Sequence, residues 1–125
     1  EWRFFLKREV EMKPEILPDS LLLGAASAAT QVEGGDVNCN WYQWSLQGHV
    51  GNGESSLTGA DHYRRYREDI DIMSSLGIQT YRMSIEWSRI EPAKGEWSSE
   101  GIGHYRDEIS CLRKKNIVPL VTLHW

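Results

Sequence analysis

The pattern of apolar positions predicts two amphipathic helices, the first in the middle of the chain. Four apolar side chains recur there at a spacing of three or four residues: Tyr63, Tyr66, Ile70 and Met73. Thr58, with Asp61 three residues later, resembles a capping box before this run, and Gly77 follows it. We therefore expect an amphipathic helix that is capped by Thr58, begins directly after it and ends before Gly77.

The second predicted helix lies nearer the C-terminus and has the same spacing. Its inner face consists of Ile102, Tyr105, Ile109 and Leu112. Ser98 or Ser99 can cap its N-terminus, because a serine hydroxyl accepts a hydrogen bond from a free N–H group of the first turn. Asn116 tolerates the left-handed conformation that commonly follows a helix, so we place the C-terminus there.

Three segments have the pattern of strands. The clearest one alternates apolar and polar side chains: Tyr81, Arg82, Met83, Ser84, Ile85 and Glu86. This period of two gives the strand one apolar and one polar face. The other two segments are short apolar runs. One starts at Leu21, Leu22 and Leu23, which we expect to open a buried strand, and the other covers residues 119–123.

The order strand, helix, strand, helix, strand predicts an α/β fold with a parallel sheet. A doubly wound sheet and a barrel share this order. The polar face of the second strand favours a barrel, because helices cover both faces of a doubly wound sheet, and we expect Arg82, Ser84 and Glu86 to face a wet interior. A complete (β/α)₈ TIM barrel needs about 250 residues. The chain has 125 residues, so we expect it to supply about the first three strands and two helices.

The composition divides the chain at residue 18. Residues 1–18 are charged and irregular and contain Pro14 and Pro18, which predicts an N-terminal arm or leader. Residues 19–125 are expected to form the N-terminal part of the barrel, incomplete at the C-terminus. Within them, the Gly- and Asn-rich segment 34–58 is predicted to be a long loop, and a loop of that length in a compact domain is usually functional.

The charge, the apolar runs and the cysteines of the sequence argue against several classes of binding partner and cofactor. A net charge of -4 without a cluster of Lys or Arg argues against nucleic acid. No apolar run reaches the roughly 18 residues of a membrane span, so we expect no membrane partner. Acidic residues precede the longest run, unlike in a signal peptide, and we expect a cytoplasmic protein. Cys39 and Cys111 are expected to be free thiols, and neither their spacing nor that of the histidines predicts a metal or another cofactor.

Four segments carry motifs in a fixed order. They are GAASAATQVEG at 24–34, DHY at 61–63 with EDI at 68–70, YRMSIEWSRI at 81–90, and Pro92 with Gly95. Together they resemble glycoside hydrolase family one, the β-glucosidases and 6-phospho-β-glucosidases, and the resemblance runs from about Leu21 to Trp125.

The resemblance implies roles for four residues. The glutamine of the family's first motif, here Gln31, binds sugar hydroxyls, which suits an amide with two donors and an acceptor; the alternative is an amide that ties strand to loop. The family's second-strand arginine, here Arg82, supports the nucleophilic glutamate; the alternative is a structural ion pair. The family's sugar-binding histidine corresponds to His124 in a gapped alignment and to the position of Trp125 in an ungapped one, and only one of these side chains can face the pocket.

The implied function is that of a retaining β-glycosidase that hydrolyses β-glucosides or related β-glycosides. Such enzymes use two carboxyl groups about 5 to 5.5 Å apart. In the family these groups follow the fourth and seventh strands, so we expect no catalytic residue in this chain and no activity from it alone. We expect Glu33 to fix the loop after the first strand and Glu86 to balance Arg82 or Arg89.

Two further expectations concern partners and tryptophans. The substrate would be a small β-glycoside or an oligosaccharide, and the protein partner either the remainder of the barrel or a second copy. The alternative function is that of a non-catalytic carbohydrate-binding relative of the same fold. Trp41 and Trp44 are expected at the pocket mouth or as loop anchors, whereas Trp87 and Trp97 are expected in the core.

Overall fold

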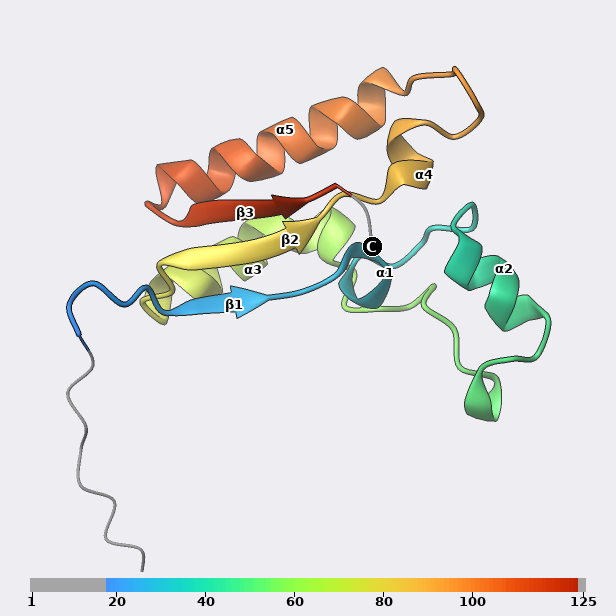
Figure 1. Ribbon diagram of the computed structural model, residues 1–125, viewed down its shortest axis with the longest axis horizontal. Helices are drawn as coiled ribbons and strands as arrows, with labels where there is room; N and C mark the ends of the chain where they lie inside the picture. The colour runs from blue at the N-terminus through green and yellow to red at the C-terminus, as the bar shows by residue number, and fades with distance from the viewer. Residues whose placement is uncertain (1–17, 124–125) are drawn as a thin grey trace, which may run out of the picture.

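A computed structural model describes residues 18–123. Three strands form one sheet in the order β1-β2-β3: β1 (Gly24–Ala26), β2 (Thr80–Ser84) and β3 (Val118–Thr122). Both pairs are parallel, and Arg82 lies between Ala26 and Leu120 in the register. The arrowheads of all three strands point the same way in Figure 1. The predicted parallel sheet is therefore confirmed.

Two long helices cover one face of this sheet (Figure 1). They are α3 (His62–Ser75) and α5 (Ser99–Lys114), the two helices that the apolar periodicity predicts. Their inner residues form one core with the apolar face of β2, and the members of the core are Tyr66, Ile70, Tyr81, Met83, Ile90, Tyr105, Leu112 and Ile117. Burial of this shared apolar surface is what holds each helix on the sheet.

The opposite face of the sheet carries Arg82, since side chains alternate along a strand and the neighbouring Tyr81 and Met83 face the helices. Its neighbour Leu120 is 54% exposed. Ser84 belongs to the same face as Arg82 and lines a pocket at the C-terminal ends of the strands. It is buried, and its Oγ accepts a hydrogen bond from the Ala29 N–H at 2.7 Å. Glu86 lies beyond the end of β2.

The helix ends confirm one predicted cap and correct another. Ser98 caps α5, since its Oγ accepts a hydrogen bond from the Gly101 N–H, and Asn116 after α5 has a φ of 60°. The capping box expected before α3 is wrong. Asp61 occupies the cap position in a left-handed conformation with no side-chain capping bond, and its carboxylate instead accepts from Arg64 Nε at 2.8 Å.

The start of the first strand also differs from the prediction. The strand begins at Gly24, and the three preceding leucines are 48–54% exposed rather than buried. Gly24 fits a close approach of the backbone, because a Cβ at this position would lie 2.7 Å from the Thr80 carbonyl oxygen. The absence of a side chain at Gly24 therefore allows β1 to lie close to β2 at Thr80.

Short helices occupy the segments that follow the C-terminal ends of β1 and β2, as Figure 1 shows. The sequence pattern missed all of them: α1 (Ala29–Val32), α2 (Asn40–Leu46), η1 (Gly51–Gly53) and α4 (Trp87–Ile90). Segment 34–58 is thus not one irregular loop. Among residues 18–123, no helix combines the length and the apolarity of a membrane span.

Candidate functional site

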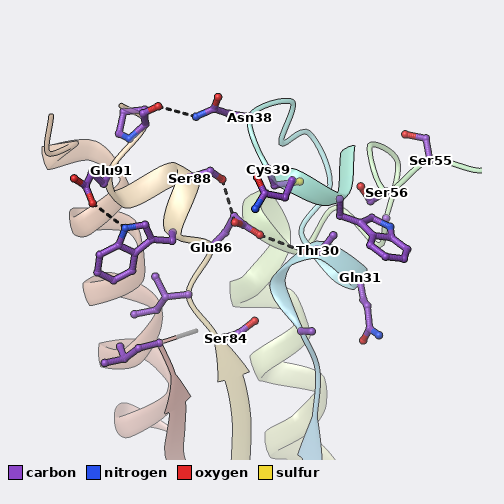
Figure 2. A pocket seen from close by; sticks show the side chains of 18 of the residues that line it. Thr30, Gln31, Asn38, Cys39, Ser55, Ser56, Ser84, Glu86, Ser88 and Glu91 are labelled. Carbon is purple, nitrogen blue, oxygen red and sulfur yellow. Dashed lines mark hydrogen bonds between the residues drawn. The ribbon is translucent and has the colours of Figure 1, made fainter. Parts of the chain in front are cut away.

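A pocket of about 1270 Å³ opens at the C-terminal ends of the strands. Four segments supply most of its wall: the end of β1 with α1, the start of α2, residues 54–59, and residues 84–94 after β2. Figure 2 shows side chains from these segments around the hollow. In parallel α/β folds this edge of the sheet is where ligands bind, so the pocket is the candidate site.

Gln31 contributes an exposed amide to this pocket. It is the third residue of α1 and lines the wall beside Ala28 and Thr30. Figure 2 shows its side chain extending away from α1, with the amide group at its free end. The structure thus gives Gln31 an exposed position at the pocket rather than that of a buried amide between strand and loop.

Glu86 also lines the pocket, and it connects the segments after β1 and β2. Its Oε2 accepts a hydrogen bond from Thr30 Oγ1 on α1 at 3.1 Å, and its Oε1 lies 3.1 Å from Ser88 Oγ. Arg89, which we expected as a partner of Glu86, pairs with a different carboxylate. The prediction that Glu86 balances the charge of Arg89 is therefore wrong.

That carboxylate is Glu33, at the centre of a buried group that we call the Glu33 cluster: Glu33, Arg89 and Tyr105. Arg89 Nε donates to Glu33 Oε2 and the Tyr105 hydroxyl donates to Glu33 Oε1, both at 2.8 Å. Arg89 Nη2 also donates to the Gly34 carbonyl oxygen at 2.6 Å. These bonds confirm that Glu33 fixes the loop after β1.

Burial dominates the electrostatics of the Glu33 cluster. It raises the pKa of Glu33 to about 7, against the hydrogen bond from Tyr105 and the charge of Arg89, which both lower it. Burial also raises the pKa of Tyr105, so its hydroxyl keeps its proton and remains a donor. The Arg89 guanidinium lies 3.9 Å from the centre of the Tyr63 ring, which adds a cation–π contact on α3.

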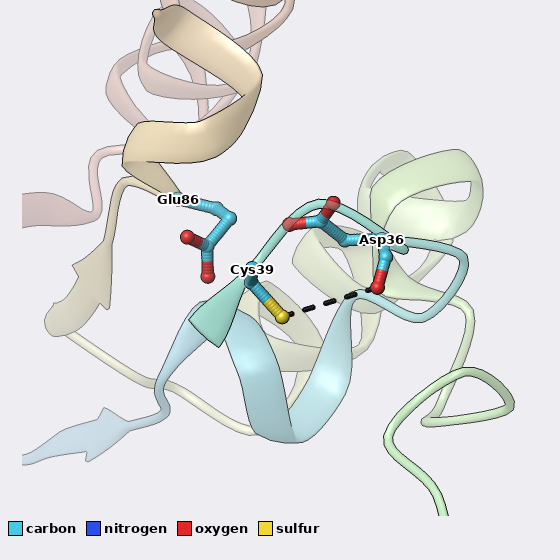
Figure 3. Close-up of side chains that lie close together, drawn as sticks. All are labelled: Asp36, Cys39 and Glu86. Atoms are coloured by element: carbon cyan, nitrogen blue, oxygen red, sulfur yellow. Dashed lines mark hydrogen bonds between the residues drawn. The ribbon is translucent and has the colours of Figure 1, made fainter. Parts of the chain in front are cut away.

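Asp36, Cys39 and Glu86 bring one ligand atom each within 4.8 Å of one another (Figure 3). Their hydrogen bonds account for this arrangement. Asp36 accepts from the Asn38 N–H and from Ser88, and the Cys39 sulfur accepts from the Tyr42 N–H at the start of α2. Burial raises the pKa of the Cys39 thiol, and a protonated thiol is a poor metal ligand. We therefore interpret the group as a structural corner of the loop; Cys39 and Cys111 are free thiols, as expected.

The other residues singled out from the sequence lie in different places. Arg82 is half-buried on β2, and its carbonyl accepts from the Ser27 N–H at 2.9 Å; among residues 18–123, the pocket wall includes Gln31 but not Arg82. His124 and Trp125 lie outside the described residues. The structure therefore brings Gln31 together with Glu86, which the sequence did not connect.

The four tryptophans of interest are all on the surface. Trp41 lines the pocket, and Trp44 stacks on His49 at a ring-centroid distance of 3.8 Å. Trp87 and Trp97 are 43% and 60% exposed, so the expectation that they belong to the core is wrong. Trp87 instead lines the pocket and donates from Nε1 to Glu91 at 2.9 Å. The spacing of apolar residues in the sequence does not distinguish a surface tryptophan such as Trp87 from a tryptophan in the core.

Comparison with known proteins places this chain in a family. The family model for glycosyl hydrolase family 1 matches residues 13–125. Beta-glucosidase A of Thermotoga maritima is 37% identical over 91% of this chain, and the rice protein named probable inactive beta-glucosidase 14 is 40% identical over 85% of it. The chain spans 27% of the length of the first relative and 22% of that of the second.

A solved structure agrees with these relatives. The solved structure of the beta-glucosidase from Thermotoga maritima in complex with cyclophellitol matches with a TM-score of 0.81 and 36% identity, over 87% of this chain and 27% of that one. The three parallel strands and their helices correspond to part of the (β/α)₈ barrel of such enzymes. The chain belongs to glycosyl hydrolase family 1.

Proposed function

We propose that these residues are the N-terminal part of a retaining β-glycosidase that hydrolyses β-glucosides or related β-glycosides. The observation that carries the proposal is the pocket at the C-terminal ends of the strands, which presents Gln31 in a chain of this family. The relatives support the activity, since Thermotoga maritima beta-glucosidase A covers most of the chain at 37% identity. The two catalytic carboxyl groups would come from later strands of the barrel.

Within this proposal, Gln31 binds sugar hydroxyls. Its exposed amide lines the pocket, and an amide can donate to one hydroxyl and accept from the next. In the gapped alignment His124 would supply a further sugar contact, whereas in the ungapped alignment Trp125 takes the position of the histidine, whose own role is then unfilled. Trp41 in the same wall offers an apolar ring face for the sugar.

Arg82 is proposed to support the nucleophilic carboxylate. Its side chain belongs to the sheet face opposite to the helices, which is the interior face of a barrel built from this sheet. A fixed guanidinium keeps a nearby carboxylate ionised and oriented, and the nucleophile needs both properties.

Kinetics on an aryl β-glucoside test the proposal in the full-length protein that contains these residues. Gln31→Ala should raise KM about 5- to 150-fold, since a lost polar contact in a desolvated site costs roughly 1–3 kcal/mol. Gln47→Ala, at the exposed end of α2, is the matched control and should leave KM unchanged. Arg82→Met should mainly lower kcat. An unchanged kcat in a folded Arg82→Met variant would contradict the role of Arg82.

A non-catalytic carbohydrate-binding protein is the second candidate. The rice relative supports it, because its name describes it as probably inactive and it is 40% identical to this chain. The two candidates differ in the carboxylates of the later strands. A full-length protein that binds a glucoside through Gln31 but shows no turnover, and lacks a glutamate after the fourth or seventh strand, would favour the second candidate.

A further inference from the structure

The Glu33 cluster joins the segments after β1 and β2. Glu33 is the C-cap of α1 after β1, and Arg89 belongs to α4 after β2. Tyr105 on α5 completes the connection, because its oxygen accepts the Glu86 N–H at 3.0 Å while its proton goes to Glu33. All three side chains thus act on two of the four segments that form the pocket wall.

Helix α1 depends on such contacts for its orientation. It has only four residues, far fewer than the roughly 12 that an isolated helix needs to be even marginally stable. Gln31 lies on this helix two residues before Glu33. Gln31 is exposed at the pocket, whereas Glu33 is 4% exposed and faces the core. A change at Glu33 therefore rotates or loosens the short helix that carries Gln31.

The surrounding backbone leaves little room for adjustment. Gly34 has a φ of 72°, and a Cβ there would lie 3.0 Å from the Thr58 carbonyl oxygen. On the other side of the cluster, a Cβ on Gly101 of α5 would lie 2.2 Å from the Arg89 carbonyl oxygen. Each of the two segments is thus close-packed against a third one, the segment after β1 against residues 57–58 and the segment after β2 against α5, which limits how far either can move when the cluster is changed.

We propose that Glu33, Arg89 and Tyr105 are positioning residues that hold α1 so that the Gln31 amide meets the sugar. This inference rests on the proposed sugar-binding role of Gln31. None of the three needs to touch the substrate. Each acts through the orientation of α1 relative to the segment that begins at Glu86.

Tyr105→Phe is the sharpest variant, since it removes one hydroxyl and with it the bonds to Glu33 Oε1 and to the Glu86 N–H. Tyr66→Phe is the matched control, because Tyr66 is a buried tyrosine of the same core, 7% exposed against 2% for Tyr105, but lies on α3 outside the cluster. Should Tyr105→Phe fail to fold, Arg89→Lys replaces it. A lysine keeps the charge but lacks the fork that reaches both Glu33 and the Gly34 carbonyl oxygen.

Hydrogen exchange measured by mass spectrometry on the full-length protein gives the first readout. Tyr105→Phe should speed amide exchange about tenfold or more in both peptides that cover 28–36 and 85–92, because a lost tertiary bond favours local opening. Tyr66→Phe should leave both peptides at the wild-type rate. Unchanged exchange in Tyr105→Phe would overturn the inference that the Glu33 cluster holds the two segments together.

Hydrolysis of an aryl β-glucoside gives the second readout. Tyr105→Phe should lower kcat/KM about tenfold through KM, and in a Gln31→Ala background the same change should cost less than about twofold, since residues that act through one another are not additive. An equal loss in both backgrounds, or a loss in kcat alone, would mean a structural defect and overturn the inference. A wild-type protein without turnover would refute the proposed activity instead, and exchange would still decide whether the Glu33 cluster holds the two segments together.

Discussion

Replacing His62 with glutamine is expected to destabilise the α3–α5 pair in a pH-dependent manner. His62 Nδ1 lies 2.6 Å from Asp69 Oδ2, and its Nε2 lies 3.0 Å from Glu108 Oε1 on α5. His62 and Glu108 are 6% and 1% exposed. The imidazolium therefore bridges the buried carboxylate of Glu108 and the partly exposed carboxylate of Asp69.

The magnitude follows from the pKa of His62. Burial alone lowers this pKa, but the hydrogen bonds to Glu108 and Asp69 outweigh burial and raise it from 6.5 to about 9. At about 1.36 kcal/mol per pKa unit, the charged form contributes about 3 kcal/mol to the free energy of unfolding. Because the folded pKa is the higher one, this contribution is complete below about pH 6.5 and is lost as the pH rises through about 9.

Guanidinium unfolding of the full-length protein at pH 6, 7.5, 9 and 10 measures this contribution. His62→Gln should lose about 3 kcal/mol at pH 6, in the range known for one broken buried pair, and the difference from wild type should shrink toward pH 10. His49→Gln, at an exposed position, is the matched control and should stay within about 0.5 kcal/mol of wild type. A difference that does not change between pH 6 and pH 10 would refute the charged state of His62.

Two glycines, the N-cap of α5 and the edges of the sheet give further predictions. Gly101→Ala should lower stability by about 1–3 kcal/mol, because its Cβ would lie 2.2 Å from the Arg89 carbonyl oxygen. Gly103→Ala, which meets nothing within 4 Å on the same helix, should raise stability by up to about 1 kcal/mol; equal melting temperatures of the two variants would contradict the close contact. Ser98→Ala should cost about 1 kcal/mol through the lost cap of α5, measured by thermal unfolding, and no loss would mean that the cap is dispensable. Residues 1–125 expressed alone should self-associate on size-exclusion chromatography, because β1 and β3 are the edges of the sheet, and a monomer that melts cooperatively would contradict this. They should also show no turnover of an aryl β-glucoside, because the two catalytic carboxyl groups would come from later strands, and measurable turnover would contradict that.

The long elements could be predicted from the sequence, and the short ones could not. Helices α3 and α5 each repeat an apolar position over several turns, so the period of 3.6 residues is visible. Helices α1 and α4 have four residues each, too few to show a period. Their ends are fixed by tertiary bonds such as the one from Thr30 to Glu86, which spans 56 residues of sequence.

The residues of the candidate site also differ in whether the sequence could predict them. The resemblance to the family singled out Gln31, and the structure gives it a position in the pocket wall. The pairing of Glu33 with Arg89 was not foreseen, because charges carry no local signal of which distant partner they meet. The exposure of Trp97 was missed for a related reason, since a large ring suggests burial whenever its neighbours are unknown.

The stereochemistry of hydrolysis tests the central claim most directly. The full-length protein should be mixed with an aryl β-glucoside, and the anomeric proton of the released sugar should be followed by NMR before mutarotation. A retaining β-glycosidase releases the β-anomer first, because two displacements at the anomeric carbon restore its configuration. Initial release of the α-anomer would contradict the assignment of a retaining mechanism to the protein that contains this chain.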